Sequence, residues 1–103
     1  MFYLRSKEQR DARKALVPFT QPLEMGNIVY NNGKCYGRLT CHDHTVFEAS
    51  FRSDKEIQAR NRMCDILETI ITYLAEHIEN AIEEGEIEGI IDLENWKEDI
   101  LGA

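Results

Sequence analysis

The sequence has no long hydrophobic run, and none of its apolar stretches approaches the roughly 20 residues that a helix needs to span a bilayer. A charged side chain already appears at Arg5, so the start of the chain does not have the apolar region of a secretory signal. We therefore expect a soluble protein that makes no membrane contact and is kept in the cytoplasm.

Cysteine is also scarce. Three cysteines occur, Cys35, Cys41 and Cys64, an odd number without a C-x-x-C spacing, so we expect free thiols rather than a disulfide framework. With 103 residues, of which 43% are hydrophobic and 30% charged, the chain has the size and composition of a single globular domain, residues 1–103.

Catalytic motifs are missing as well. The sequence contains no glycine-rich phosphate loop and no HExxH, and Cys41 beside His42 is not a dyad, because neighbouring strand residues point to opposite faces. Cys35 and Cys41 lie about 20 Å apart in an extended chain, too far to share a zinc ion, which leaves only His42 and His44 as a pair. We predict no catalytic residues, no metal, no cofactor and no enzymatic activity.

The patterns that are present predict an α+β fold. Alternation with a period of two predicts a three-stranded antiparallel meander over residues 27–52, with strands at 27–30, 34–41 and 45–51 and turns at 31–33 and 42–44. In the middle strand one face is apolar, and Tyr36 and Arg38 stand on the opposite, polar face.

A long helix is predicted over residues 54–84, with Ser53 in a capping box at its start and Gly85 at its end. Its apolar arc of about 200° is wider than the stripe of about 100° that a helix buries on one sheet. We infer that a second copy covers the excess in a homodimer or larger assembly. The expected interface residues are Leu67, Ile71, Leu74 and Ile78.

The two ends of the chain are less sharply defined. Residues 1–26 are expected to form an N-terminal arm, with a short helix or a mobile basic segment from Ser6 to about Leu16. Residues 86–91 fit either a strand or a broken helix. Residues 92–101 are predicted to form a short C-terminal helix, anchored to the core by Trp96.

Charge is divided along the chain. Residues 1–62 have 11 basic and 7 acidic side chains, whereas residues 63–103 have one base, Lys97, and 12 acids, for a net charge of −7. The acidic half favours a basic protein surface as the partner. The residues expected to bind it are Glu76, Glu79 and Glu83. Acidic groups with gaps of about 12 Å are too patchy to mimic nucleic acid.

The basic half suggests an alternative. Tyr36, Arg38, Arg52, Arg60 and Arg62 could converge on a phosphate-bearing small ligand such as a nucleotide, or the arginines could balance the acidic half of a neighbouring subunit. Direct binding of nucleic acid is not expected.

Three functions therefore remain open. The first is a non-catalytic inhibitor or adaptor, of the kind that phages and other mobile elements encode as accessory or anti-defence proteins. The second is the oligomeric small-ligand module, and the third is a purely structural homo-oligomer.

Overall fold

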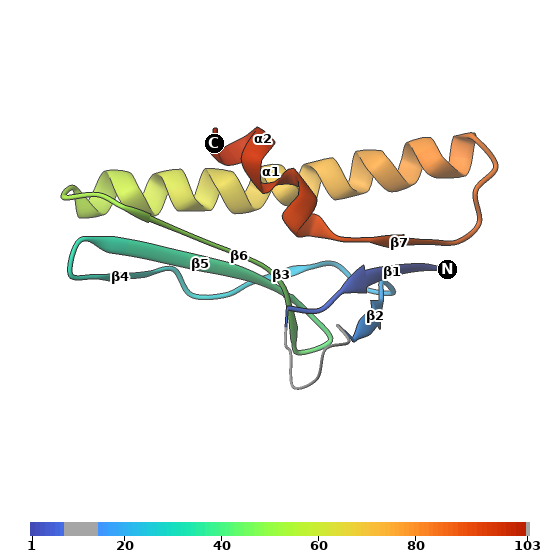
Figure 1. Cartoon of the computed structure of the whole chain (residues 1–103), viewed down its shortest axis with the longest axis horizontal. Coiled ribbons are helices and arrows are strands. Elements are labelled where there is room, and N and C mark those ends of the chain that lie inside the picture. The colour runs from blue at the N-terminus through green and yellow to red at the C-terminus, as the bar shows by residue number, and fades with distance from the viewer. Residues whose placement is uncertain (8–14, 103) are drawn as a thin grey trace.

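The computed structural model describes residues 1–7 and 15–102 (Figure 1). Within these residues it is a mixed α+β fold with seven strands in two sheets, one long helix and a short C-terminal helix. In chain order the elements are β1 Phe2–Arg5, β2 Leu16–Pro18, β3 Glu24–Met25, β4 Val29–Asn31, β5 Lys34–Cys41, β6 His44–Arg52, α1 Glu56–Glu83, β7 Gly89–Ile91, the 3-10 helix η1 Leu93–Trp96, and α2 Lys97–Leu101.

The larger sheet matches the predicted meander in part: β4, β5 and β6 follow one another as antiparallel neighbours, but β3 is a fourth strand and β4 begins two residues later than predicted. Its central strand β5 has the predicted bounds and pairs antiparallel with β6 on one side and with β4 and β3 on the other. Both connecting turns use left-handed backbone, at Asn32 and Gly33 (φ 51° and 74°) and at His42 and Asp43 (φ 49° and 65°), as two-residue hairpin turns require. The strand β3 was not predicted, because a pair of residues is too short to show alternation.

A β-bulge sets the burial of β6. The register pairs Leu39 with Phe47 but Thr40 with Thr45, so Val46 is an extra residue on β6. As a result Thr45, Val46 and Phe47 are buried in succession, which strict alternation would not allow. Phe47 is the largest of the fully buried side chains.

The second sheet has the strand order β2–β1–β7, with β1 antiparallel to β2 and parallel to β7. The prediction that residues 1–26 are only an arm was therefore wrong for β1 and β2. Most of the predicted helix after Ser6 falls on residues 8–14, which lie outside the described residues. The strand option for residues 86–91 is correct for Gly89–Ile91.

The helix α1 ends as predicted but begins differently. Gly85 adopts a φ of 88°, and its N–H donates to the Ile82 carbonyl at 3.0 Å while the Glu86 N–H donates to Ala81 at 2.9 Å, a Schellman motif. At the start, Lys55 rather than Ser53 occupies the N-cap position, without a side-chain cap. The Ser53 hydroxyl instead accepts a hydrogen bond from the Lys55 N–H at 3.2 Å.

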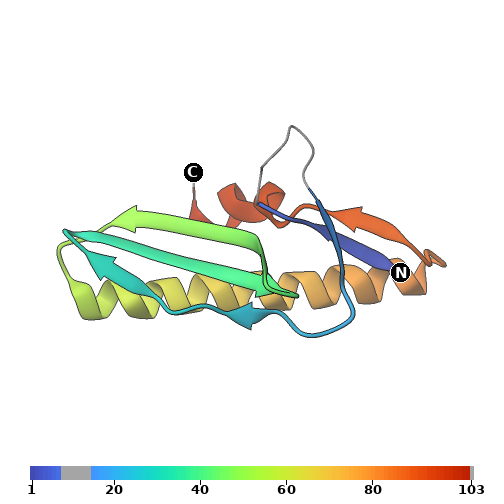
Figure 2. The ribbon, with the colours of Figure 1, turned by 90° about the horizontal axis from the view of Figure 1, so that it is seen from below.

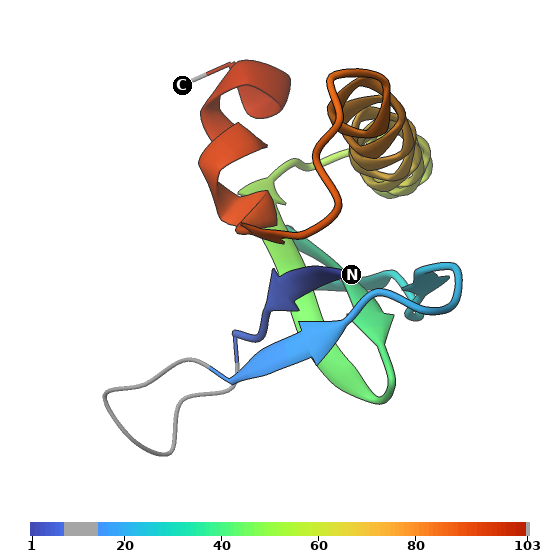
Figure 3. The same cartoon turned by 90° about the vertical axis from the view of Figure 1, so that its right-hand side faces the viewer.

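The strands form one layer and the helices the other. Seen from below, the long strands β5 and β6 run along α1 at a shallow angle (Figure 2). Seen from the end, α1 and the C-terminal helical segment lie side by side on the same side of the sheets (Figure 3). The C-terminal segment begins as η1 and continues as α2. Trp96 packs edge-on against Tyr73 of α1, with 6.4 Å between the ring centroids.

This C-terminal segment also covers the free edge of β6. A carboxylate oxygen of Glu94 accepts a hydrogen bond from the Glu48 N–H at 3.2 Å and pairs with Lys7 at 3.2 Å. Lys97 pairs with the second oxygen of Glu94. The unpaired N–H of an edge strand is a site for unwanted pairing with other chains, and Glu94 occupies it.

The two layers lie close together at Gly37 in β5. A Cβ atom at this position would lie 2.6 Å from Cγ of Met63, 2.8 Å from its Sδ and 3.2 Å from Cδ1 of Leu67. Glycine therefore allows α1 to lie directly on the central strand.

We expect Gly37→Ala to lower the free energy of unfolding by about 1–3 kcal/mol, the usual cost of overpacking a core. Met63, whose side chain an added Cβ would meet, is fully buried. Urea denaturation measures the effect, and Ser50→Ala on the exposed face of β6 is the control. Adding Met63→Ala should recover part of the loss, and additive effects of the two changes would contradict the contact.

Candidate partner-binding surface

An acidic ridge runs along the exposed side of α1. At about 100° per residue, its members lie opposite the buried residues of the helix, which pack on the sheet. All of them are exposed, and none forms an ion pair with another described residue. The acidic ridge consists of Asp65, Glu68, Glu76, Glu79 and Glu83.

The position of these acids opposes the stability of the helix. The C-terminal end of a helix carries a partial negative charge, which favours basic side chains. The last turn of α1 contains no base, and Glu83 and Glu84 stand there instead, followed by Glu86 and Glu88. Because this arrangement costs stability, the requirements of the fold do not explain it, and a binding role would.

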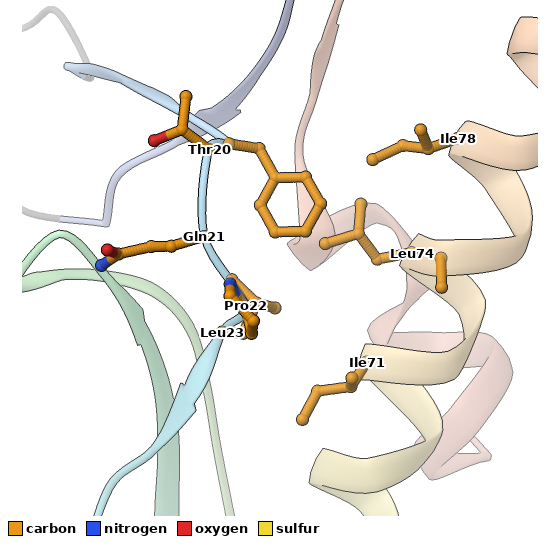
Figure 4. A pocket seen from close by; sticks show the side chains of 9 residues that line it. Thr20, Gln21, Pro22, Leu23, Ile71, Leu74 and Ile78 are labelled. Carbon is orange, nitrogen blue, oxygen red and sulfur yellow. The ribbon is translucent and has the colours of Figure 1, made fainter.

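An apolar groove lies beside the ridge, between α1 and residues 19–23 (Figure 4). Its volume is about 490 Å³. Phe19 and Leu23 form one wall, and Ile71, Ala75 and Ile78 of α1 form much of the other. The remaining lining residues are Thr20, Gln21, Pro22 and Leu74.

The groove and the ridge are continuous on the helix surface. Ala75 is exposed and lies four residues before Glu79, and Ile71 lies three residues after Glu68. A partner in the groove would therefore meet acids along one border. The wall at residues 19–23 was not predicted as part of a site. Pro18 and Pro22 favour an extended segment there, but nothing local shows that it lies against α1.

Fewer of the expected interface residues are available to a second copy than the sequence predicted. Leu67 and Leu74 are 0% and 1% exposed, so the monomer already covers two of the four expected interface residues. Ile71 and Ile78 are partly buried and line the groove. The reason is that the 19–23 segment and the C-terminal helices cover part of the apolar arc that the sequence left without a partner.

The five residues proposed for a phosphate site do not converge. Arg60 donates to the Ile28 carbonyl at 2.8 Å, on the β4 side of the sheet, and lies 3.6 Å from Glu56. Arg62 stacks on Phe51 of β6, 4.6 Å from the ring centroid, on the other side. The expectation that these arginines meet was therefore wrong, because a spacing of two residues turns about 200° around a helix.

Tyr36, Arg38 and Arg52 lie on the outer face of the larger sheet, away from α1. The Tyr36 hydroxyl donates to a carboxylate oxygen of Glu48 at 2.8 Å. Burial raises the pKa of Tyr36, and the hydrogen bond to the Glu48 carboxylate raises it further.

The turn from Cys41 to His44 does not have the geometry of a metal site. Cys41 is buried, whereas His42 is exposed and shares a hydrogen bond of 2.8 Å with the Thr20 hydroxyl. Among residues 1–7 and 15–102, no group of three or more His, Cys, Asp or Glu side chains is placed to hold a metal ion. In the same part of the chain, no helix combines the length and apolar composition needed to cross a bilayer.

The chain matches no protein-family model, and comparisons with curated proteins and with solved structures find no significant match. The candidate site is therefore defined by its own geometry: an acidic ridge and an adjoining apolar groove on a two-layer α+β domain.

We expect Glu83→Lys to raise the free energy of unfolding by roughly 0.3–1 kcal/mol at low salt, because a base replaces an acid at the helix C-terminus. Thermal or urea denaturation measures the change. Glu68→Lys, near the middle of the helix, is the control and should have little effect through the dipole. Destabilisation by Glu83→Lys with a smaller effect of the control would contradict the opposed dipole.

The thiol of Cys64 reports the charge of the ridge. Burial raises its pKa first, followed by the hydrogen bond to the Glu68 carboxylate, 3.5 Å away, and by the charges of Glu68 and Asp65. Glu68→Gln removes one negative charge and should lower the pKa, so that more thiolate forms at a given pH.

The pH profile of alkylation by iodoacetamide measures this shift, and it should move to lower pH in the Glu68→Gln variant. Cys35 and Cys41 are buried and should react only on unfolding. The exposed Glu24→Gln change, on β3, is the control. An unchanged profile for Cys64 would show that the ridge does not act on it.

Proposed function

We propose that the protein is a non-catalytic binding protein, an adaptor or inhibitor that contacts a basic protein segment through the acidic ridge and the adjoining groove. The observation that supports this proposal is an open apolar groove bordered by a row of exposed acids that form no ion pair with any other described residue. Apolar side chains of the partner would enter the groove, and its basic side chains would meet the ridge.

The two parts have different roles in such binding. Removing apolar surface from water gives about 25 cal/mol per Å², so the groove supplies affinity. The ridge steers association and selects for positive charge, and its effect decreases with salt because the Debye length is about 8 Å at physiological ionic strength. The residues of the ridge that determine selectivity for the partner are Glu76, Glu79 and Glu83.

Charge also argues against two copies meeting through identical surfaces. A symmetric dimer across the groove would bring Glu68 and Glu79 of each copy towards the acids of the other, and like charges across an interface cost several kcal/mol. The predicted homodimer through Ile71 and Ile78 therefore needs a different arrangement.

Further apolar side chains extend the surface beyond the groove. Ile82 on α1 is 60% exposed, and Ile87 and Ile90 after it are 81% and 54% exposed. Glu83, Glu84 and Glu86 stand between Ile82 and Ile87, and Glu88 stands between Ile87 and Ile90. A surface that mixes apolar and acidic side chains in this way fits an amphipathic basic segment.

A pair of synthetic peptides tests the proposal. One is an amphipathic helix of leucine and lysine, and its twin has glutamate in place of lysine. We expect the lysine peptide to bind at least about tenfold more tightly, a difference of about 1.4 kcal/mol. Fluorescence anisotropy measures both affinities at low and high salt.

Two sets of variants locate the binding. Glu76→Lys, Glu79→Lys and Glu83→Lys together should abolish the preference for the lysine peptide. Ala75→Phe, which fills the groove from an exposed position, should weaken binding of either peptide. The matched control is Glu24→Lys, Asp54→Lys and Glu98→Lys, an equal change in net charge at exposed acids outside the ridge. Equal effects of the two triple variants would contradict a ridge-specific site.

A further inference from the structure

The outer face of the larger sheet carries basic side chains, whose charge is opposite to that of the acidic ridge. Lys34 and Arg52 stand directly opposite each other in the β5–β6 register, and Arg38 follows on the same face of β5. All three are exposed, and within residues 1–7 and 15–102 none of them forms an ion pair. We call Lys34, Arg38 and Arg52 the basic sheet face.

The pairing of Lys34 with Arg52 is unfavourable in the monomer. Like charges directly opposite each other on a sheet are destabilising. Two described acids lie near Arg38: Glu24 lies opposite Thr40, two residues along β5, and Glu48 lies opposite Arg38 itself. The Glu48 carboxylate accepts from the Tyr36 hydroxyl at 2.8 Å and lies 4.0 Å from Lys7. Within residues 1–7 and 15–102, neither of these acids forms an ion pair with the basic sheet face.

The acidic ridge of the same molecule cannot pair with the basic sheet face. The ridge lies on the far side of α1 from the sheet, and the basic sheet face lies on the far side of the sheet from α1. Helices and strands form separate layers (Figure 3). The exposed acids of the ridge lie on the helical layer, and the exposed basic residues Lys34, Arg38 and Arg52 lie on the strand layer. Within residues 1–7 and 15–102, neither surface forms an ion pair with the other, so both are open to an oppositely charged surface of another molecule.

We propose that the acidic ridge of one copy docks on the basic sheet face of the next. A second copy then takes the place of the basic partner in the proposed function, on which this proposal rests. The dimensions agree: Lys34 to Arg38 spans about 13 Å of strand, and Glu76 to Glu83 about 10 Å of helix. Arg52 beside Lys34 adds a second cation at one end of the row.

The arrangement is heterologous, because the two docking surfaces differ and lie on opposite layers. Each copy therefore keeps one free surface of each sign, and the assembly grows open-ended unless the rotation between copies closes a ring. This geometry avoids the contact between identical acidic surfaces that a symmetric dimer would make. It assigns the basic side chains of the sheet to an interface rather than to a small phosphate ligand.

Charge-swapped variants test the docking. The first variant carries Lys34→Glu, Arg38→Glu and Arg52→Glu, and the second carries Glu76→Lys, Glu79→Lys and Glu83→Lys. Alone, each variant opposes like charges at the interface and should sediment as a monomer. Mixed in equal amounts, each ridge meets an oppositely charged sheet face, so association should return.

Sedimentation velocity of the full chain measures the result. The unchanged protein should associate with rising concentration at about 0.01 M salt, where the Debye length is about 30 Å, and dissociate at about 1 M, where it is about 3 Å. An unchanged protein that stays monomeric at low salt overturns the proposal. So does an equimolar mixture that stays monomeric while the unchanged protein associates, because association then uses another surface, such as the groove.

If the first variant does not fold by circular dichroism, the neutral set Lys34→Gln, Arg38→Gln and Arg52→Gln replaces it. This set removes the like-charge pair and should keep its thermal stability while losing association, and retained association overturns the proposal. Peptide binding separates the two levels. If the unchanged protein is monomeric but binds the lysine peptide through its ridge, self-docking alone is refuted. If the unchanged protein does not prefer the lysine peptide, the proposed function is refuted.

Discussion

The contact between α1 and β5 at Gly37 determines which surfaces this protein presents. Because glycine leaves room for Met63 and Leu67, the helix lies directly on the central strand and turns its apolar side inward. The opposite side of the helix then faces outward, and it is the side that carries the acidic ridge. A bulkier residue at position 37 would separate the layers and weaken the core on which both exposed surfaces depend.

Charge and fold stability are opposed at the C-terminal end of α1. Helix formation there is supported by the Schellman motif at Gly85 and by burial of Leu74 and Ala81, not by electrostatics. A similar conflict occurs at the Lys34–Arg52 pair in the sheet. Both conflicts lie on exposed surfaces, so an oppositely charged partner would relieve them without any change in the core.

The small second sheet explains why α1 leaves less apolar surface for a partner to cover than the width of its apolar arc implies. By pairing β1 with β2 and β7, it holds the N-terminal segment near the C-terminal half of α1, where residues 19–23 cover part of the helix. Coverage is incomplete along Ile71, Ala75 and Ile78, and the groove is what remains. The groove is thus a consequence of the way two distant parts of the chain share one helix.

The sequence by itself determined the features that depend on local pattern. Alternation predicted β5 and its buried face, turn residues predicted both hairpins, and Gly85 predicted the end of α1. The sequence also predicted which side of α1 is acidic and exposed, because exposure follows from helical periodicity.

Only the tertiary structure decided the rest. The parallel pairing of β1 with β7 joins the two ends of the chain, and no local pattern encodes a partner so distant in sequence. The burial of Leu67 and Leu74 and the groove likewise depend on which segments pack on each side of α1. Periodicity shows that a helix face is apolar, but what covers that face is set by long-range packing.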